Sequence, residues 1–146
     1  MRYLHAMIRV LDPKKTISFF CENFEMKVIS ERQNESARFT LYFLAFSDDV
    51  DRFGEEAPKI ELTHNWDETI AYSSGRSFGH LAFEVENIYS VCERLKKNGV
   101  DLLRPPRDGK MAFVKTPDQI SIELLQAGSP LEPLNPWKDM PNQGSW

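Results

Sequence analysis

Two stretches of the chain, residues 3–10 and 78–86, alternate between apolar and polar side chains. Such alternation is typical of a β-strand with one face in a core, because successive side chains point to opposite faces of the sheet. The apolar face of each stretch is continuous, whereas the other face of each carries a histidine, His5 or His80. We therefore predict two related strands that each present a polar face to a second environment.

Each of these strands begins an imperfect internal repeat. A helical pattern follows each strand, at residues 12–24 and 87–98, and the tripeptide Ile-Glu-Leu recurs at residues 60–62 and 122–124. Three matches in the same order indicate two copies of one structural module rather than a chance similarity.

The ends of the helices and the remaining strands also leave signals in the sequence. Asp12 and Asn87 are typical helix N-caps, Pro13 suits the first helical position, and Asn98 followed by glycine is a common end of a helix. Further strands are expected at residues 26–33, 37–46, 59–64, 100–103, 110–114 and 121–126.

Together these elements predict an α+β fold in which two βαβββ modules follow one another. Module 1 covers about residues 1–66 and module 2 about residues 78–127, and the two form one domain, residues 1–128. The acidic stretch 47–58 is expected to be a solvated loop, and the polar stretch 67–77 to link the modules.

The last residues, 129–146, are rich in proline and contain Trp137 and Trp146. A segment with so many prolines cannot form a regular helix or a central strand. Its two tryptophans indicate that this C-terminal tail docks on the surface of the protein.

Composition narrows the class of protein. A chain of 146 residues with 41% hydrophobic content can form one packed domain. Its 18 basic and 22 acidic residues give a net charge of -4, which predicts neither nucleic-acid binding nor attraction to an anionic membrane. No apolar run approaches the roughly 20 residues of a transmembrane helix, the start does not resemble a signal peptide, and two cysteines are too few for a disulfide scaffold. We expect a cytoplasmic protein.

Two glutamates have the same parity as the two histidines. Glu61 and Glu123 each lie between an isoleucine and a leucine, so each carboxylate points away from the apolar side of its strand. Burial of a lone carboxylate is costly unless it is paired or binds a metal ion. Two imidazoles and two carboxylates form a plausible ligand set for zinc, nickel or cobalt. The alternative is four separate, partly exposed polar residues on an open sheet face. His64 is out of phase with Glu61 and is not expected to be a ligand.

These segments resemble glyoxalase I, or lactoylglutathione lyase, a family of the vicinal-oxygen-chelate superfamily with the glyoxalase/bleomycin-resistance fold. The resemblance extends from residue 1 to about residue 126, and four segments carry it: residues 1–10, 60–66 (IELTHNW), 78–82 and 117–124. It implies a divalent metal ion bound by His5, Glu61, His80 and Glu123. It also implies a homodimer in which His5 and Glu61 of one chain join His80 and Glu123 of the other.

The family reaction isomerises the hemithioacetal of glutathione and methylglyoxal to lactoylglutathione, as a proton leaves C1 and returns to C2 through an enediolate. By this resemblance Glu123 is the first choice for the base that carries the proton, and Glu61 is the second. The resemblance also assigns glutathione binding to Arg9, Asn65, Arg76, Arg104 and Lys110. Phe43 and Phe113, with Tyr42 and Met111, are candidates to line an apolar substrate pocket.

Two other functions remain open, and the chain departs from the family pattern in places. The alternatives are another metalloenzyme of the superfamily, such as a dioxygenase or an epimerase, and a non-catalytic protein that binds a small molecule. Gln119 replaces the glycine of the usual Pro-Asp-Gly turn, which is expected to change that turn. Residues 108–113 form a loop about three residues shorter than is typical, and the tail lies outside the common core.

Overall fold

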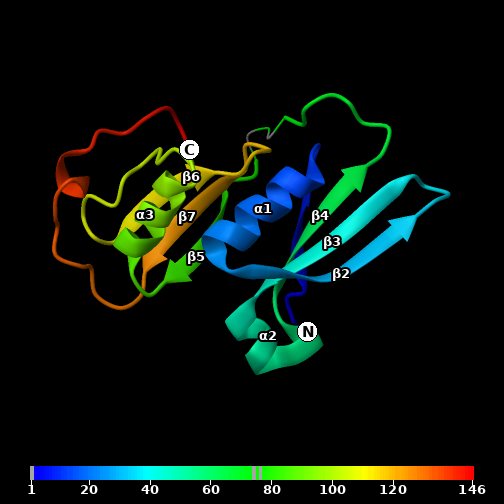
Figure 1. The fold of residues 1–146 in the computed structure, drawn as a ribbon, viewed down its shortest axis with the longest axis horizontal. Coiled ribbons are helices and arrows are strands. Elements are labelled where there is room, and N and C mark those ends of the chain that lie inside the picture. Colours follow the sequence, from blue (N-terminus) through cyan, green and yellow to red (C-terminus); the bar gives the residue numbers. More distant parts are fainter. Residues whose placement is uncertain (1, 74, 76) are drawn as a thin grey trace. The chain divides into compact units, whose positions relative to one another are not determined.

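A computed structural model describes residues 2–73, 75 and 77–146 (Figure 1). The chain divides into two compact units, Met1–Ser73 and Ser74–Trp146, and each is described by itself. Each unit contains a strand, a helix and further strands in the predicted order. Among the described residues, no helix has both the length and the apolar character needed to cross a membrane.

The first unit folds as one helix against a sheet. Within residues 2–73 the sheet has four strands in the order β1-β4-β3-β2, with β1 and β4 parallel and the other neighbours antiparallel. The elements are β1 (His5–Arg9), α1 (Pro13–Phe24), β2 (Met26–Asn34), β3 (Phe39–Phe46), α2 (Ser47–Phe53), a 3-10 turn η1 (Gly54–Glu56) and β4 (Lys59–Asn65).

The helix α1 covers the apolar face of this sheet (Figure 1). It begins as predicted, because the Asp12 side chain accepts a hydrogen bond from the Lys15 backbone nitrogen at 3.1 Å and Pro13 occupies the first turn. Its buried side chains include Phe19 and Phe20, and the sheet contributes the buried residues Ile8, Val10, Leu44, Ile60 and Leu62. The opposite face of the sheet, which carries His5, is left uncovered by α1.

One prediction for this unit is wrong. Residues 47–58 are not a loop throughout, because residues 47–56 form α2 and the turn η1. Asp48 and Asp49 lie in the first turn of α2, where a negative charge is favourable beside the helix dipole. No residue of α2 is buried, so hydrophobic periodicity, the main sequence signal of a helix, is missing.

The second unit repeats this plan with a smaller sheet. Within residues 77–146 the sheet has three strands in the order β5-β7-β6, with β5 and β7 parallel and β6 and β7 antiparallel. The elements are β5 (His80–Val85), α3 (Ile88–Lys97), β6 (Met111–Lys115), β7 (Ser121–Gln126) and a 3-10 turn η2 (Trp137–Asp139). Asn87 caps α3 as predicted and accepts a hydrogen bond from the Ser90 backbone nitrogen at 3.1 Å.

The strand predicted at residues 100–103 does not form. These residues, all of them described, lead only to an isolated bridge between Arg104 and Phe113. Pro105 and Pro106 follow at once, and proline cannot donate the hydrogen bonds that a strand needs. The second sheet therefore lacks the counterpart of β2.

The C-terminal tail packs on α3, as expected from its tryptophans (orange to red in Figure 1). Trp137 is only 2% exposed and stacks on Tyr89, with ring centroids 6.3 Å apart. The Tyr89 hydroxyl donates a hydrogen bond to the Glu132 carbonyl at 2.9 Å, and Lys96 lies over the Trp137 ring. The tail is thus an ordered part of the second unit.

Gln119 adopts a φ of 67°, the left-handed region that glycine enters freely. Its backbone nitrogen closes a turn by donating to the Thr116 carbonyl at 2.9 Å. A residue with a side chain therefore holds a left-handed conformation here, at a cost of about 1 kcal/mol, and the expected difference from the usual Pro-Asp-Gly turn stays a prediction.

Candidate metal centre

A histidine and a glutamate from parallel neighbouring strands form a pair in the first unit. In the register of β1 and β4, Met7 faces Glu61. His5 lies two residues before Met7, so its side chain is on the same face of the sheet as the Glu61 carboxylate. The His5 Nε2 atom is 3.1 Å from the Glu61 Oε2 atom. Phe43 of β3 faces Glu61 from the other side, and its ring meets the His5 ring edge to face at 5.9 Å.

The second unit contains the same arrangement. Ala82 faces Glu123 in the register of β5 and β7, and His80 precedes Ala82 by two residues. The His80 Nε2 atom is 3.0 Å from the Glu123 Oε2 atom. Phe113 of β6 faces Glu123 and meets the His80 ring edge to face at 5.5 Å. The two units thus carry matching half-sites, each of one histidine, one glutamate and one phenylalanine.

The separation of the donor atoms is that of an ordinary hydrogen bond between imidazole and carboxylate, and it also fits two ligands of one metal ion. Two ligand atoms that each lie about 2.1 Å from a divalent ion, at right angles, are about 3.0 Å apart. The Nε2–Oε2 distances of both half-sites agree with this value. Both carboxylates are mostly buried, at 13% and 15% exposure, while the histidines remain accessible at 37% and 41%. An ion could therefore be reached from solvent and held by a preformed pair of donors.

Each unit supplies only two donors. Among the described residues there is no group of three or more histidine, cysteine, aspartate or glutamate side chains that could hold a metal ion. A metal centre with two imidazoles and two carboxylates would therefore need the ligands of both half-sites. This four-ligand centre stays a prediction.

The third histidine is separate from both pairs. His64 faces Thr40 in the register of β3 and β4, on the side of the sheet that α1 covers. Within the described structure, its buried Nδ1 atom has no hydrogen-bond partner. This position agrees with the prediction that His64 is not a metal ligand.

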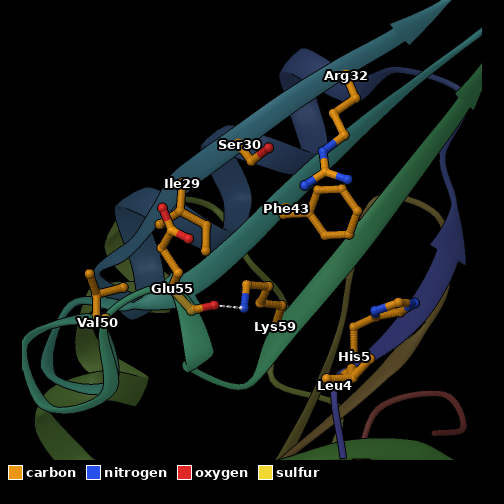
Figure 2. Close-up of a pocket in the computed structure, with 10 residues that line it drawn as sticks. Leu4, His5, Ile29, Ser30, Arg32, Phe43, Val50, Glu55 and Lys59 are labelled. Atoms are coloured by element: carbon orange, nitrogen blue, oxygen red, sulfur yellow. Dashed lines mark hydrogen bonds between the residues drawn. The ribbon is translucent and has the colours of Figure 1, made fainter.

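A cavity of about 730 Å³ lies beside the first half-site, on the open face of the sheet (Figure 2). Apolar side chains form much of its wall, including Phe43, which the sequence suggested as a pocket residue. His5 lies at its edge, and Lys59 is held by the carbonyls of Glu55 and Ala57 at 2.5 and 2.9 Å. The volume is in the range of small-molecule sites.

Arg32 is a cavity residue that the sequence analysis missed. Its guanidinium lies over the Phe43 ring, 5.4 Å from the ring centroid (Figure 2). Arg32 belongs to β2, where a β-bulge between Val28 and Ser30 shifts the register. A bulge reverses the alternation of side chains beyond it, so the sequence pattern did not show which face Arg32 takes.

Three of the expected substrate-binding residues belong to or follow the first unit. Arg9 is exposed on the face of β1 that carries His5, and it faces Thr63 of β4. Asn65 lies on the same face, one further step along β4, and donates a hydrogen bond to the Tyr72 hydroxyl at 2.8 Å. Arg76 lies outside the described residues. The role of all three in binding stays a prediction.

The other two expected substrate-binding residues hold the loop between α3 and β6. Arg104 Nη2 contacts Asp108 Oδ2 at 2.7 Å, and Arg104 Nη1 donates to the Met111 carbonyl. Burial raises the pKa of Asp108, but hydrogen bonds from Arg104 and from the Lys110 and Met111 amides outweigh it and lower that pKa to about 2. Lys110 Nζ donates to the carbonyls of Gln126 and Gly128 at 2.7 and 3.0 Å. A substrate would have to compete with these partners.

Comparison with known proteins places this geometry in context. Residues 2–124 match the model of the Glyoxalase/Bleomycin resistance protein/Dioxygenase superfamily. The chain is 38% identical to a lactoylglutathione lyase of Neisseria meningitidis, over 88% of this chain and 93% of that protein. It is 39% identical to a probable lactoylglutathione lyase of Synechocystis, over 88% of this chain and 98% of that protein.

A solved structure supports the same relationship. The trypanothione-dependent glyoxalase I of Leishmania major superimposes with a TM-score of 0.78 at 33% identity, covering 86% of each chain. The predicted fold class is confirmed by this likeness and by the family match. Membership of such a family also implies a divalent metal ion, with which the donor chemistry of the two half-sites agrees.

Removal of one donor should abolish tight metal binding. We expect His80→Ala to lower the affinity for zinc or nickel by more than about 100-fold, beyond the effect typical of residues that only orient a ligand. His64→Ala is the matched control, because it removes the same ring from the opposite face of a sheet. Calorimetric titration of metal-free protein measures both, and equal affinities in the two variants would contradict the assignment.

Proposed function

The chain belongs to the Glyoxalase/Bleomycin resistance protein/Dioxygenase superfamily, and we propose that it is a metal-dependent lactoylglutathione lyase. This enzyme isomerises the hemithioacetal of glutathione and methylglyoxal to lactoylglutathione and so removes a reactive 2-oxoaldehyde. The prediction of an enzyme of this class is confirmed by the bacterial relatives that carry this name. The observation that carries the proposal is the pair of matching His–Glu half-sites.

The donor set suggests which residues hold the ion and what it supplies. His5, Glu61, His80 and Glu123 provide two imidazole nitrogens and two carboxylates, which suit zinc, nickel or cobalt. A divalent ion held by these residues would supply Lewis-acid chemistry, which favours the build-up of negative charge on the substrate oxygens. Its protein ligands stand on strands, so their positions are set by the sheet rather than by mobile loops.

A carboxylate of the site moves the substrate proton. Glu123 takes the proton from C1 and returns it to C2, which is general acid–base catalysis by one group. Glu61 is the second choice, because the two half-sites have nearly the same donor distances. Low exposure of these carboxylates keeps the proton from being lost to water between the two transfers.

Polar and cationic side chains bind the glutathione part of the substrate. Glutathione offers two carboxylates, and arginine binds carboxylates in a planar bidentate geometry. Arg9 and Asn65 share the open face of the first sheet with His5, and they are assigned this role together with Arg76, Arg104 and Lys110. Arg32 adds a cation to the cavity next to His5.

We also propose that the active protein is a cytoplasmic homodimer. Because each unit supplies two of four ligands, a complete site needs both kinds of half-site. In the proposed dimer His5 and Glu61 of one chain join His80 and Glu123 of the other, which makes two sites per dimer.

Metal-free protein reconstituted with zinc, nickel or cobalt should form the thioester from glutathione and methylglyoxal. The rise in absorbance of the thioester measures the reaction, and protein without added metal is the control. Activity that depends on one or more of these ions supports the proposal. Metal uptake without thioester formation would contradict the reaction and would favour another activity of the superfamily.

Replacement of Glu123 by glutamine should separate proton transfer from metal binding. We expect Glu123→Gln to lower kcat by about 100- to 10,000-fold, the usual contribution of a general base, with a much smaller loss of metal affinity. Glu84→Gln is the matched control, because Glu84 is exposed on the same face of β5 as His80. A Glu123→Gln enzyme with wild-type kcat would rule out Glu123 as the base.

Mixing two inactive variants should restore activity if sites form between chains. A dimer of His5→Ala with His80→Ala contains one intact site and one that lacks both histidines. Random pairing makes about half of the dimers mixed, and each mixed dimer has one intact site out of two. About a quarter of the wild-type activity should therefore return. The measurement is thioester formation after the two chains are refolded together. Absence of any recovery would show that each site comes from a single chain.

A further inference from the structure

The C-terminal tail is attached to the second unit by specific contacts along its length. Leu131 donates a backbone hydrogen bond to the Gly109 carbonyl at 3.0 Å, and a side chain at Gly109 would collide with the Leu131 backbone. Arg107 donates to the Met140 carbonyl at 3.0 Å and to Asn142 Oδ1 at 2.6 Å. The tail therefore rests on the loop between α3 and β6.

The last part of the tail reaches the strand that carries Phe113. The Gln143 backbone nitrogen donates to the Leu103 carbonyl at 2.8 Å, and Leu103 in turn bonds to the Phe113 carbonyl. The Trp146 ring stacks on the Phe113 ring, with centroids 5.6 Å apart and planes inclined by 26°. The end of the chain lies beside β6 in Figure 1.

This stack adjoins the second half-site, because Phe113 contacts both Trp146 and His80. Phe113 faces Glu123 on the open face of the sheet, and its ring meets the edge of the His80 ring. Phe113 is nevertheless only 6% exposed, so the open face is covered at this position. Trp146 itself is 42% exposed and borders a cavity of about 300 Å³ that also reaches Lys115 and Ser121. The indole thus packs on Phe113 from the solvent side and is not part of the core.

The first half-site has a different support for its phenylalanine. There the guanidinium of Arg32, from β2, lies over Phe43. The second sheet has no strand in the position of β2 among the described residues, and the ring of Trp146 takes up the corresponding contact with Phe113. The two half-sites therefore match in their histidine, glutamate and phenylalanine. They differ in the side chain that packs on the phenylalanine.

We propose that Trp146 is a positioning residue for the metal ligand His80 and acts through Phe113. The tail brings the indole to the Phe113 ring, and the stack between them fixes that ring. The contact between the Phe113 ring and the His80 ring then limits the orientations of the imidazole. A fixed imidazole binds a metal ion more tightly than one that must be ordered on binding. The proposal rests on the metal centre proposed above, but it does not depend on which reaction that centre catalyses.

The test uses the ring signals of the three histidines in metal-free protein at one pH. Carbon-13-labelled histidine gives one set of ring signals each for His5, His64 and His80, which single substitutions assign. We expect Trp146→Ala to move and broaden the His80 signals and to leave the His5 signals in place. Trp146→Phe should restore them in large part, because it retains an aromatic ring. Leu134→Ala, an exposed substitution elsewhere in the tail, is the matched control.

Metal affinity gives a second readout. Trp146→Ala should weaken zinc or nickel binding about 10-fold, the lower end of the effect of losing a group that orients a histidine ligand, and Trp146→Phe should lie close to wild type. Unchanged His80 signals with unchanged affinity would overturn the proposal, as would equal movement of the His5 signals. If the shifts and the weakened affinity occur but no variant and no wild-type protein forms lactoylglutathione, the proposed reaction fails and this inference stands.

Discussion

Each half-site depends on the register of one parallel strand pair. In each pair a histidine begins the first strand and a glutamate lies two rows further along its neighbour, so that both side chains leave the sheet on the same face. A slip by one residue would turn Glu61 or Glu123 toward the helix and break the His–Glu contact. The buried apolar residues on the helix side therefore also determine the chemistry, because their burial holds the register.

The two half-sites are equivalent in their first contacts and differ in what surrounds them. Histidine, glutamate and phenylalanine have nearly the same distances and ring angles in both units. Beyond the phenylalanine, the first unit has a full strand, an arginine and an open cavity, whereas the second has a short loop, a bound tail and a tryptophan. The internal repeat accounts for the matching donors, and the two half-sites differ in what surrounds their phenylalanines.

The loop between α3 and β6 connects the fold to the tail. Arg104, Asp108 and Lys110 use their charges within the loop or on the backbone of the tail, and the lowered pKa of Asp108 reflects how many donors converge on it. The positive charges of Arg104 and Lys110 therefore already have hydrogen-bond partners within the protein. Of the cations suggested for glutathione, Arg9 is exposed on the same open face as His5.

Local signals in the sequence determine most of the strands and helices of this protein. Alternation of side chains, the internal repeat and the caps Asp12 and Asn87 were sufficient to predict the strands that carry His5, Glu61, His80 and Glu123, because these signals act over a few residues. The same signals failed for α2, which buries nothing, and for residues 100–103, which precede two prolines.

Only the tertiary structure decided the rest. The bulge that turns Arg32 toward Phe43, the partners of Lys110 and the stacking of Trp146 on Phe113 join residues far apart in the chain or depend on a strand neighbour. Periodicity reports the face of a strand on which a side chain lies, but it cannot report which distant segment covers that face. For this reason the donors could be predicted from the sequence, while their surroundings required the folded chain.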